Sequence, residues 1–383
     1  MKRKALLFIA LAWIVAAAYS SDQRVVAIGD VHGAFDDFVA ILQTAAVIDE
    51  QRSWAGRNTT LIQTGDILDR GSRGRATMDL LMLLEQQAPK ARGRVLFLLG
   101  NHETMNLIGD LRYVPPEEYA NYIDAASEKR REAAYQAFLE FRKRRAKAWK
   151  QPETTSSEEL KSQWRESHPP GFLEQREAFS PKGKYGKWLR GRDAIAEIDG
   201  TVFLHGGISP VISHLTVKQL NQRVKDEIKL FDTYKARLVQ KNVILPFFTF
   251  EEMTTAVKED LQFRQESGNQ DAKLLQDFLS IKGWLIMNKD GPLWFRGYAE
   301  WSDDEGGPQV EALVKTYGIK HLVVGHTVQQ DGWIRTRFHN GVLLIDTGML
   351  RSYAPNGQAS ALEVQKGIFT GIYKNKRVGL ILP

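Results

Sequence analysis

The stretch VLFLLGNHETMNLIG, residues 95–109, joins an apolar run to a polar cluster without a break. Its first five residues are all apolar, which predicts a short buried strand. The run stops at Gly100, and an amide, an imidazole and a carboxylate follow at once in Asn101, His102 and Glu103. Such side chains at the end of a buried strand predict a functional site held on a rigid support.

Two earlier stretches have the same order of strand, glycine and acid. They are RVVAIGDVHG, residues 24–33, and TTLIQTGDILDRG, residues 59–71. Helical patterns at 34–48 and 78–87 separate the three strands, and this alternation is typical of an α/β sheet with parallel strands. Because ligands gather outside the carboxyl ends of such strands, we expect the three polar clusters to meet at one edge of the sheet.

The rest of the chain divides into helical and strand-forming parts. Residues 113–190 and 211–289 carry mostly helical patterns with polar breaks, and we interpret them as insertions that form a cap beside the strand edges. Strand signals return late, in HLVVGHT, GVLLIDTG, ALEVQKG and FTGIYK.

Composition places the chain among ordinary globular proteins, with 43% hydrophobic and 26% charged residues in 383. The first 20 residues, with a basic start and a short apolar run, predict a secretory signal peptide, with an uncleaved anchor as the alternative. Without the three leader cations the formal charge falls from +6 to +3 (6 − 3), too small to indicate nucleic-acid binding. From the leader we expect a secreted or periplasmic protein, without a stable membrane span after cleavage. The absence of Cys excludes disulfides.

Together with LHGGISP (204–210) and VGHT (324–327), these motifs resemble the signature of the phosphoprotein phosphatase (PPP) family of calcineurin-like metallophosphoesterases. The stretches GPLWFRG (291–297) and DTGM (346–349) and the long insertion most resemble the Shewanella-like protein phosphatases within it. The resemblance implies an α/β sandwich of two mixed β-sheets flanked by helices. Residues 21–383 would form this one metallophosphoesterase domain, with the helical insertions inside it.

The resemblance also implies two divalent metal ions, with Mn²⁺ as the first candidate and Fe, Zn²⁺ or Mg²⁺ as others. One ion would be held by Asp30, His32 and Asp66. Asp66 would bridge to a second ion, which Asn101, His205 and His326 complete. Two cations with oxygen and imidazole ligands can bind a phosphate and activate one water. Metal-assisted phosphate hydrolysis therefore requires these residue types, independently of the resemblance.

In the implied mechanism a hydroxide bound by both ions attacks phosphorus directly, and His102 protonates the leaving oxygen. Asp69 would orient His102, and Arg70 would grip the phosphate oxygens, to which Asn101 also lies close. Arg296 is a second candidate for that grip, with a surface ion pair as its alternative. For Glu103 we predict a structural role, accepting hydrogen bonds from loop backbone.

The leading hypothesis is thus an exported metal-dependent phosphomonoesterase, a protein phosphatase with a possible phosphotyrosine preference. Four aromatic residues could line its site, although each could equally belong to the core: Trp284, Trp294, Phe295 and Trp301. The role of Tyr353 in the loop 351–356 is open. The main alternative is a diadenosine tetraphosphate or other nucleotide phosphohydrolase that uses the same ligands.

A third hypothesis is a binding module. The basic helix expected at 128–150 could dock anionic lipid, nucleic acid or an acidic partner, or could be a solvated face with interleaved glutamates. We expect a phosphorylated protein or peptide as the partner and no nucleic acid, and nothing in the sequence indicates an oligomeric state.

Overall fold

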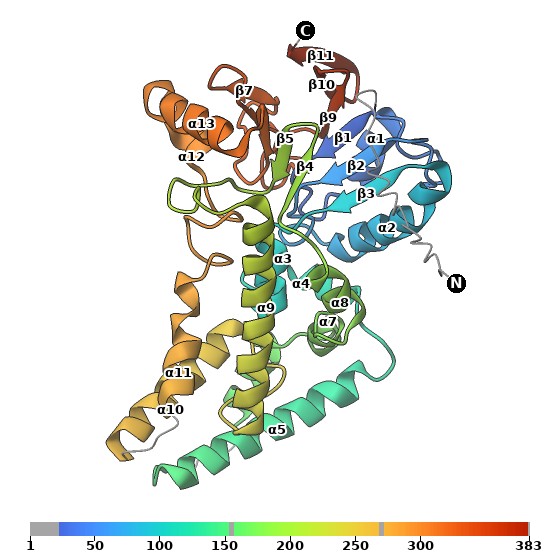
Figure 1. The fold of residues 1–383 in the computed structure, drawn as a ribbon. Coiled ribbons are helices and arrows are strands. Elements are labelled where there is room, and N and C mark those ends of the chain that lie inside the picture. Colours follow the sequence, from blue (N-terminus) through green and yellow to red (C-terminus); the bar gives the residue numbers. More distant parts are fainter. Residues whose placement is uncertain (1–22, 153–156, 268–271, 382–383) are drawn as a thin grey trace, which may run out of the picture.

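Over the described residues, 23–152, 157–267 and 272–381, the strands form two mixed β-sheets that face each other at one end of the molecule (Figure 1). The strand orders are β11-β10-β9-β1-β2-β3 and β4-β5-β6-β8-β7 in this computed structural model, which confirms the predicted fold class. The predicted signal peptide lies outside the described residues. The strands are β1 (Val25–Ile28), β2 (Thr60–Gln63), β3 (Arg94–Phe97), β4 (Ile195–Ile198), β5 (Thr201–Leu204), β6 (His321–Val324), β7 (Arg335–Arg337), β8 (Val342–Leu344), β9 (Ser360–Gln365), β10 (Ile368–Tyr373) and β11 (Lys376–Ile381).

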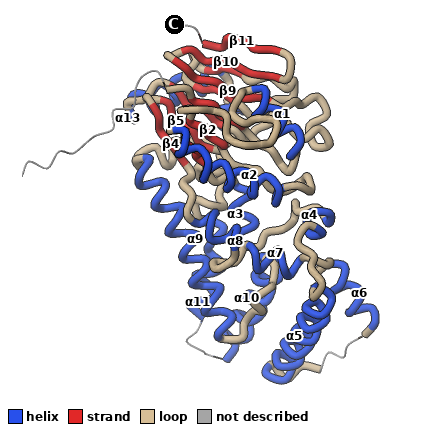
Figure 2. Tube along the Cα trace, turned by 90° about the vertical axis from the view of Figure 1, so that its right-hand side faces the viewer, coloured by secondary structure: helices blue, strands red, loops and turns tan. Residues whose placement is uncertain are grey.

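Helices flank the sheets and form the whole opposite end of the molecule (Figure 2). Those beside the sheets are α1 (Phe35–Thr44), α2 (Gly74–Gln87), the 3₁₀ turn η1 (Ala88–Ala91), α12 (Gly297–Glu300) and α13 (Asp303–Tyr317). The others are α3 (Asn101–Ile108), α4 (Pro116–Ala120), α5 (Ser127–Ala148), α6 (Glu158–Ser167), α7 (Phe172–Ala178), α8 (Lys184–Arg190), α9 (Val217–Gln240), α10 (Phe250–Ser267), α11 (Ala272–Leu279) and η2 (Ser280–Gly283).

Alternate residues of the central strands point to different cores. Val25 and Ala27 of β1 pack between the sheets, in one apolar cluster with Phe203 of the second sheet. Val26 and Ile28 point the other way, into the core that α1 and α2 cover. Both faces of these strands are therefore buried, which explains why they appear in the sequence as continuous apolar runs.

The parallel strands of both sheets end at the site. Strands β1, β2 and β3 pair in parallel in the first sheet, and β5, β6 and β8 do so in the second. The segments that follow the first five of these strands carry, in turn, the motifs at Asp30, Asp66, Asn101, His205 and His326. The predicted meeting of polar clusters at strand ends is confirmed, and the second sheet contributes to it as much as the first.

Asn101 and His102 do not project directly from a strand end, as the apolar run suggested. Strand β3 ends at Phe97, and Asn101 begins helix α3. Gly100 is extended and donates its N–H to the Glu103 carboxylate, 2.8 Å away, so the acid in the first turn satisfies the helix start. The first turn of α3, rather than a strand, holds the amide and the imidazole.

Both predicted insertions are helical. Figures 1 and 2 show α5, α9, α10 and α11 extending away from the sheets, with α3 and α4 between the two parts. No helix in the described part of the chain has the length and apolar character to span a membrane.

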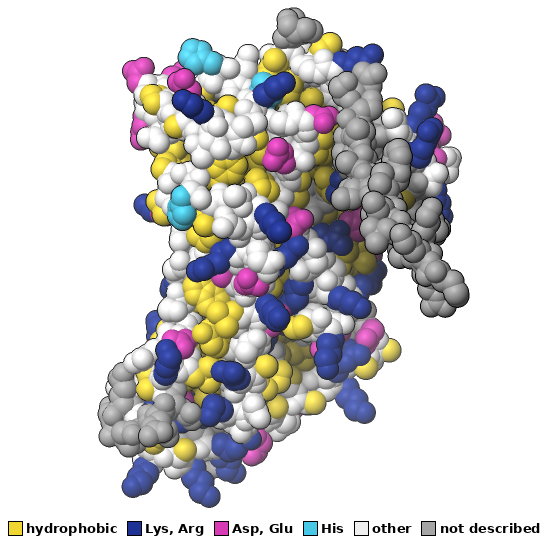
Figure 3. Space-filling view, viewed as in Figure 1, with side chains coloured by type: hydrophobic (Ala, Val, Ile, Leu, Met, Phe, Trp, Pro, Cys, Tyr) yellow, Lys and Arg dark blue, Asp and Glu magenta, His cyan; other side chains and the backbone are white. Residues whose placement is uncertain are grey.

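The basic helix α5 is partly neutralised by its neighbours. Arg130 pairs with Asp124 at 2.7 Å and with Glu174, and Arg145 pairs with Glu259 at 3.1 Å. Lys and Arg side chains are spread over the helical end together with Asp and Glu (Figure 3). These contacts favour the interpretation of a solvated, ion-paired helix over that of a dedicated anion-binding face.

The inter-sheet core generates a stability prediction. Phe203 is 1% exposed, and Phe203→Ala should lower the free energy of unfolding by about 3–5 kcal/mol because it leaves a cavity between the sheets. Leu230 on α9 is 40% exposed, and Leu230→Ala is the control, with an expected change below about 1 kcal/mol. Urea denaturation measures both, and equal losses would contradict the assignment of this core.

Candidate active site

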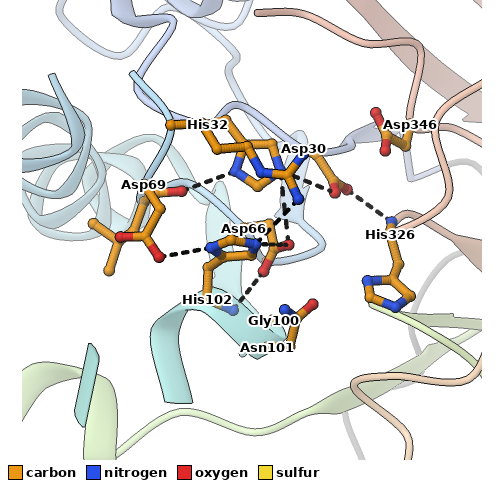
Figure 4. Close-up of polar contacts among 12 residues, drawn as sticks. Asp30, His32, Asp66, Asp69, Gly100, Asn101, His102, His326 and Asp346 are labelled. Carbon is orange, nitrogen blue, oxygen red and sulfur yellow. Dashed lines mark hydrogen bonds and ion pairs between the residues drawn. The ribbon is translucent and has the colours of Figure 1, made fainter. Parts of the chain in front are cut away.

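The site gathers the side chains that the motifs predicted. Asp30, Asp66, His102 and His326 converge in Figure 4, with Asp69 beyond His102 on the side away from His326. The residues expected to hold metal are all buried: Asp30, His32, Asp66, Asn101, His205 and His326. Two groups of candidate ligands share Asp66, namely His32, Asp66 and His102, and Asp66, His205 and His326.

Left-handed backbone conformations are concentrated here. His32, Asp66, Asp69, Arg70 and His326 have φ between 48° and 67°, a region that non-glycine residues seldom occupy. Such strain persists only where the surroundings determine the conformation, and it is typical of functional sites. The sharp turns after the strands are what bring these side chains back over the strand ends.

Hydrogen bonds join the loops to one another. The backbone N–H groups of Val31 and His32 donate to the Asp66 carbonyl at 2.9 and 3.0 Å. The Glu103 carboxylate accepts from the backbone of Asp66 at 2.7 Å and of Ile67 at 3.0 Å, in addition to Gly100. The structural role predicted for Glu103 is confirmed.

The predicted set for the first ion, Asp30, His32 and Asp66, has Asp30 in place of the His102 of the first group, and its atoms also fit one cation. His32 Nε2 lies 3.8 Å from Asp30 Oδ2 and 3.8 Å from Asp66 Oδ2. Ligand atoms roughly 2.0–2.2 Å from one ion lie about 3–4 Å apart. Asp30 Oδ2 is buried without a hydrogen-bond partner among the described residues, so a cation would satisfy an oxygen that is otherwise isolated.

The second group is closer together. His205 Nε2 lies 3.2 Å from Asp66 Oδ2, 3.0 Å from Asn101 Oδ1 and 3.0 Å from His326 Nδ1. These separations match neighbouring ligands on one ion.

Backbone carbonyls determine which ring nitrogens carry protons. A carbonyl can only accept, so the nitrogen facing it must donate. His32 Nδ1 donates to Leu68 at 2.9 Å, His205 Nδ1 to Thr64 at 3.1 Å, and His326 Nε2 to Trp294 at 3.1 Å. In the neutral rings the opposite nitrogens are then unprotonated and face other acceptors, which is the arrangement that a bound cation stabilises.

The pKa shifts agree with neutral imidazole ligands. Burial lowers the pKa of His32 to about 3, and burial, followed by the nearby His205, lowers the pKa of His326 well below its ordinary value. Burial, and then the charges of Asp346 and Asp66, raise the pKa of Asp30 well above its ordinary value. A bound metal ion would stabilise such a buried cluster of crowded carboxylate oxygens and neutral imidazoles.

His102 and Asp69 form a separate pair. His102 Nδ1 donates to Asp69 Oδ2 at 2.6 Å, while Nε2 lies 3.8 Å from Asp66 Oδ2. Burial lowers the pKa of His102, but the Asp66 charge and the hydrogen bond to Asp69 outweigh it, so the pKa of His102 is raised. An imidazole that keeps its proton and presents Nε2 to the site suits a general acid.

The two candidate arginines differ in what they contact. Arg70 Nε and Nη1 are buried and, within the described part of the chain, have no hydrogen-bond partner. Arg296 Nη1 instead donates to the His326 carbonyl at 2.9 Å and to Thr327 Oγ1 at 3.2 Å, so it supports the loop that carries His326. Its surface-ion-pair alternative is wrong, and Arg70 has the donors open to an anion.

The aromatic rim is not the one expected. Trp284 packs on Tyr234, Phe295 and Trp301 pack on each other, and the Trp294 Nε1–H donates to the Ile286 carbonyl at 2.8 Å. Trp294 does approach His326, with ring centres 6.0 Å apart. These rings therefore belong mainly to the packed interior, as the core alternative held.

Tyr113 and Tyr353 lie at the site instead, 44% and 46% exposed. The Arg70 guanidinium carbon is 3.6 Å from the Tyr353 ring centre and 5.6 Å from that of Tyr113. Tyr113 also approaches His102, with ring centres 5.2 Å apart. The sequence analysis left the role of Tyr353 unassigned and did not identify Tyr113, because neither residue belongs to one of the recognised motifs.

Asp346 is the other residue that the sequence analysis missed as part of the site. It is buried, Oδ1 accepts from Gly348 N at 3.0 Å, and Oδ2 has no partner among the described residues. Burial raises the pKa of Asp346 to about 6, and its charge acts on Asp30. The stretch GVLLIDTG did carry the signal, since it repeats the order of strand and acid found in the other motifs.

Known proteins resemble this chain in sequence and in fold. The calcineurin-like phosphoesterase family matches residues 23–330, so the chain belongs to that family. An uncharacterized protein of Schizosaccharomyces pombe is 28% identical over 93% of this chain and 82% of its own length. Shewanella-like protein phosphatase 2 of Arabidopsis thaliana is 26% identical over 92% of this chain and 78% of its own.

Shewanella-like protein phosphatase 1 of Plasmodium berghei is also 26% identical, over 85% of this chain and 67% of its own. Among solved structures, a cold-active protein-tyrosine phosphatase of a psychrophilic Shewanella species superposes with a TM-score of 0.58 at 23% identity, covering 94% of this chain and 81% of that one, which shows a shared fold. These similarities confirm the predicted resemblance. The chain is a metallophosphatase, and family membership implies divalent metal ions.

The shared ligand generates a metal-binding prediction. Because Asp66 belongs to both ligand groups, Asp66→Asn should weaken Mn²⁺ binding by more than about 100-fold, whereas changes to groups that only hydrogen-bond the ligands typically cost about 10- to 100-fold. Equilibrium dialysis with elemental analysis measures the ions held per chain. Asp304→Asn, at an exposed position of α13, is the control and should bind as the parent does. Retention of either ion at full affinity in Asp66→Asn would contradict the bridging role.

Proposed function

We propose that this phosphatase hydrolyses phosphate monoesters on proteins, preferring phosphotyrosine, by direct attack of water-derived hydroxide at a site with two divalent ions. The observation that carries the proposal is the convergence of two ligand groups on Asp66, beside an imidazole–carboxylate pair and an arginine with open donors. Asp30, His32 and Asp66 would hold one ion, and Asp66, Asn101, His205 and His326 the other. When bound, the ions supply a nucleophile at neutral pH and offset phosphate charge, with Mn²⁺ as our first candidate.

The chain's own residues divide the remaining chemistry. Arg70 offers its fork of donors to the nonbridging phosphate oxygens, and Asn101 lies beside them at the start of α3. His102 Nε2 gives its proton to the leaving oxygen as the ester bond breaks. Asp69 holds the opposite nitrogen, which keeps Nε2 directed at the site.

Tyr113 and Tyr353 support an aromatic ester as substrate. Both rings lie against Arg70, the proposed phosphate grip, so a phenyl ring attached to the phosphate would meet aromatic faces or edges. The relatives named protein phosphatases support a phosphoprotein substrate, and the protein-tyrosine phosphatase among the similar folds supports phosphotyrosine.

A neighbouring groove supports a polypeptide substrate. It has a volume of about 1410 Å³ and runs between α5 and α10, larger than the roughly 300–1,000 Å³ typical of small-molecule sites. Its lining includes residues 109–112, immediately before Tyr113. The carbonyl of Tyr113 accepts from the backbone of Arg70 at 2.8 Å, so the segment that lines the groove continues directly into a residue of the site.

Export is part of the proposal on the strength of the leader alone. The basic start and short apolar run favour cleavage after Ala18 or Ser20 and release outside the cytoplasm. Amino-terminal sequencing of the protein recovered from cells tests this, and an intact Met1 would contradict it.

Substrate preference is the first test. The Mn²⁺-loaded protein should release phosphate from a phosphotyrosyl peptide with kcat/KM at least about 10-fold above that for the phosphoseryl peptide of the same sequence, because the tyrosine pair meets only the aromatic ester. EDTA should abolish both activities and added Mn²⁺ restore them. Preference for phosphoserine would overturn the phosphotyrosine assignment. Hydrolysis of diadenosine tetraphosphate with neither peptide cleaved would overturn the protein-phosphatase assignment.

The role of His102 is tested by the leaving group. His102→Asn should lower kcat for phenyl phosphate by about 10²–10⁴-fold, because the phenolate then leaves without a proton. The loss for p-nitrophenyl phosphate should be at least about 10-fold smaller, since its leaving group needs less protonation. The control is His339→Asn, exposed and at a φ of 52° that Asn accepts. Equal losses on both esters, with metal content unchanged, would sink the general-acid assignment.

A further inference from the structure

Helix α7 of the first insertion contacts the site through Asn106 of α3. Gln175 Nε2 donates to Asn106 Oδ1 at 2.9 Å, and Asn106 Nδ2 donates to Asp69 Oδ1 at 2.8 Å. The other oxygen of Asp69 accepts from His102 Nδ1 at 2.6 Å. A continuous chain of hydrogen bonds therefore runs from the insertion to the imidazole.

The direction of every bond in this chain is determined by Asp69. An ionised carboxylate only accepts, so Asn106 must turn its NH₂ group toward Asp69. The same NH₂ group also donates to the His102 carbonyl at 2.9 Å, which holds the amide in this orientation. Asn106 Oδ1 then faces Gln175, which must present its own NH₂ group.

The chain is closed to solvent. Gln175 is 1% exposed, Asn106 2%, Asp69 3% and His102 1%. Arg176, the next residue of α7, donates to the Asn106 carbonyl at 2.8 Å and fixes the backbone of the same residue. In such low-dielectric surroundings each hydrogen bond restricts its partner strongly.

Burying the polar side chain of Gln175 costs free energy that a residue with only a packing role would not require. Its Oε1 is buried without a hydrogen-bond partner among the described residues, and an isolated buried oxygen destabilises the fold. An apolar side chain of similar size would pack there without that cost. The donor bond to Asn106 is what a polar residue adds at this position.

We propose that Gln175 acts through Asn106 and Asp69 as a positioning residue for His102. The helical insertion would thus determine the orientation of the proton donor. This inference rests on the proposed function of His102. Without the Gln175 bond the Asn106 amide keeps its two acceptors but loses the contact that fixes its oxygen, so its bond to Asp69 is less restrained. The imidazole then samples a wider range of orientations, in some of which Nε2 misses the leaving oxygen.

The test uses the Mn²⁺-loaded full chain and the two esters introduced above. Gln175→Met keeps the volume and removes the donor. It should lower kcat for phenyl phosphate by about 10-fold and for p-nitrophenyl phosphate by less than about 2-fold, with KM unchanged, because part of the proton-transfer contribution is lost. Gln163→Met on α6 is the matched control: Gln163 is exposed and bonds Glu159, and its replacement should affect neither ester.

A double-mutant cycle identifies the route. In the His102→Asn background, Gln175→Met should not lower kcat further for either ester, because the proton donor that Gln175 would position is absent. Asn106→Ala, which removes the middle member, should show the same discrimination between esters, and it keeps the test valid if Gln175→Met folds poorly.

The outcomes separate the two levels of inference. If His102→Asn does not discriminate between the esters, the proposed general acid fails. If it does, but Gln175→Met affects both esters equally or still acts without His102, then Gln175 is a packing residue and the positioning proposal is overturned.

Discussion

The site depends first on the position of Asp66. Its N–H donates to Glu103, and its carbonyl accepts from Val31 and His32 at the end of β1. Its Oδ1 accepts from the backbone N–H of His102 at 2.9 Å, and its Oδ2 faces both ligand groups. One residue, held at a φ of 57°, thus ties together the loops that follow three strands. Moving it would displace the metal ligands and the first turn of α3 together.

This geometry concentrates buried charge that the protein alone does not balance. Asp30, Asp66 and Asp346 are all within a few per cent of full burial, and the neutral imidazoles beside them offer lone pairs rather than positive charge. Burial and mutual repulsion keep the pKa of Asp30 raised, which is a measure of the cost of ionising it there. Cations that bind the folded state would remove this cost, so the same residues link metal binding to stability.

The sequence was sufficient to bring together most of the side chains that directly follow a strand, although Asp346, two residues after β8, was missed. Each strand-and-acid motif places its own side chains locally, and parallel pairing then brings the motifs together, so Asp30, Asp66 and His326 could be assigned to one site. The start of α3 at Asn101 was missed because a short apolar run followed by polar residues suits a strand end and a helix start equally well. Tyr113 was missed because its place at the site comes from the path of the loop after α3.

Gln175 shows the limit of local motifs most clearly, since it reaches Asn106 across 69 positions and no pattern in α7 indicates the contact. The fold thereby separates two tasks. Loops at the strand ends and the start of α3 supply the proposed metal ligands, and the three imidazoles among them are held by backbone carbonyls. The first insertion reaches the His102–Asp69 pair through Gln175 and Asn106. Helices of both insertions, α5 and α10, line the groove. If Gln175 positions His102 as we propose, changes in the insertion alter how the leaving group is protonated while the proposed ligand set stays intact.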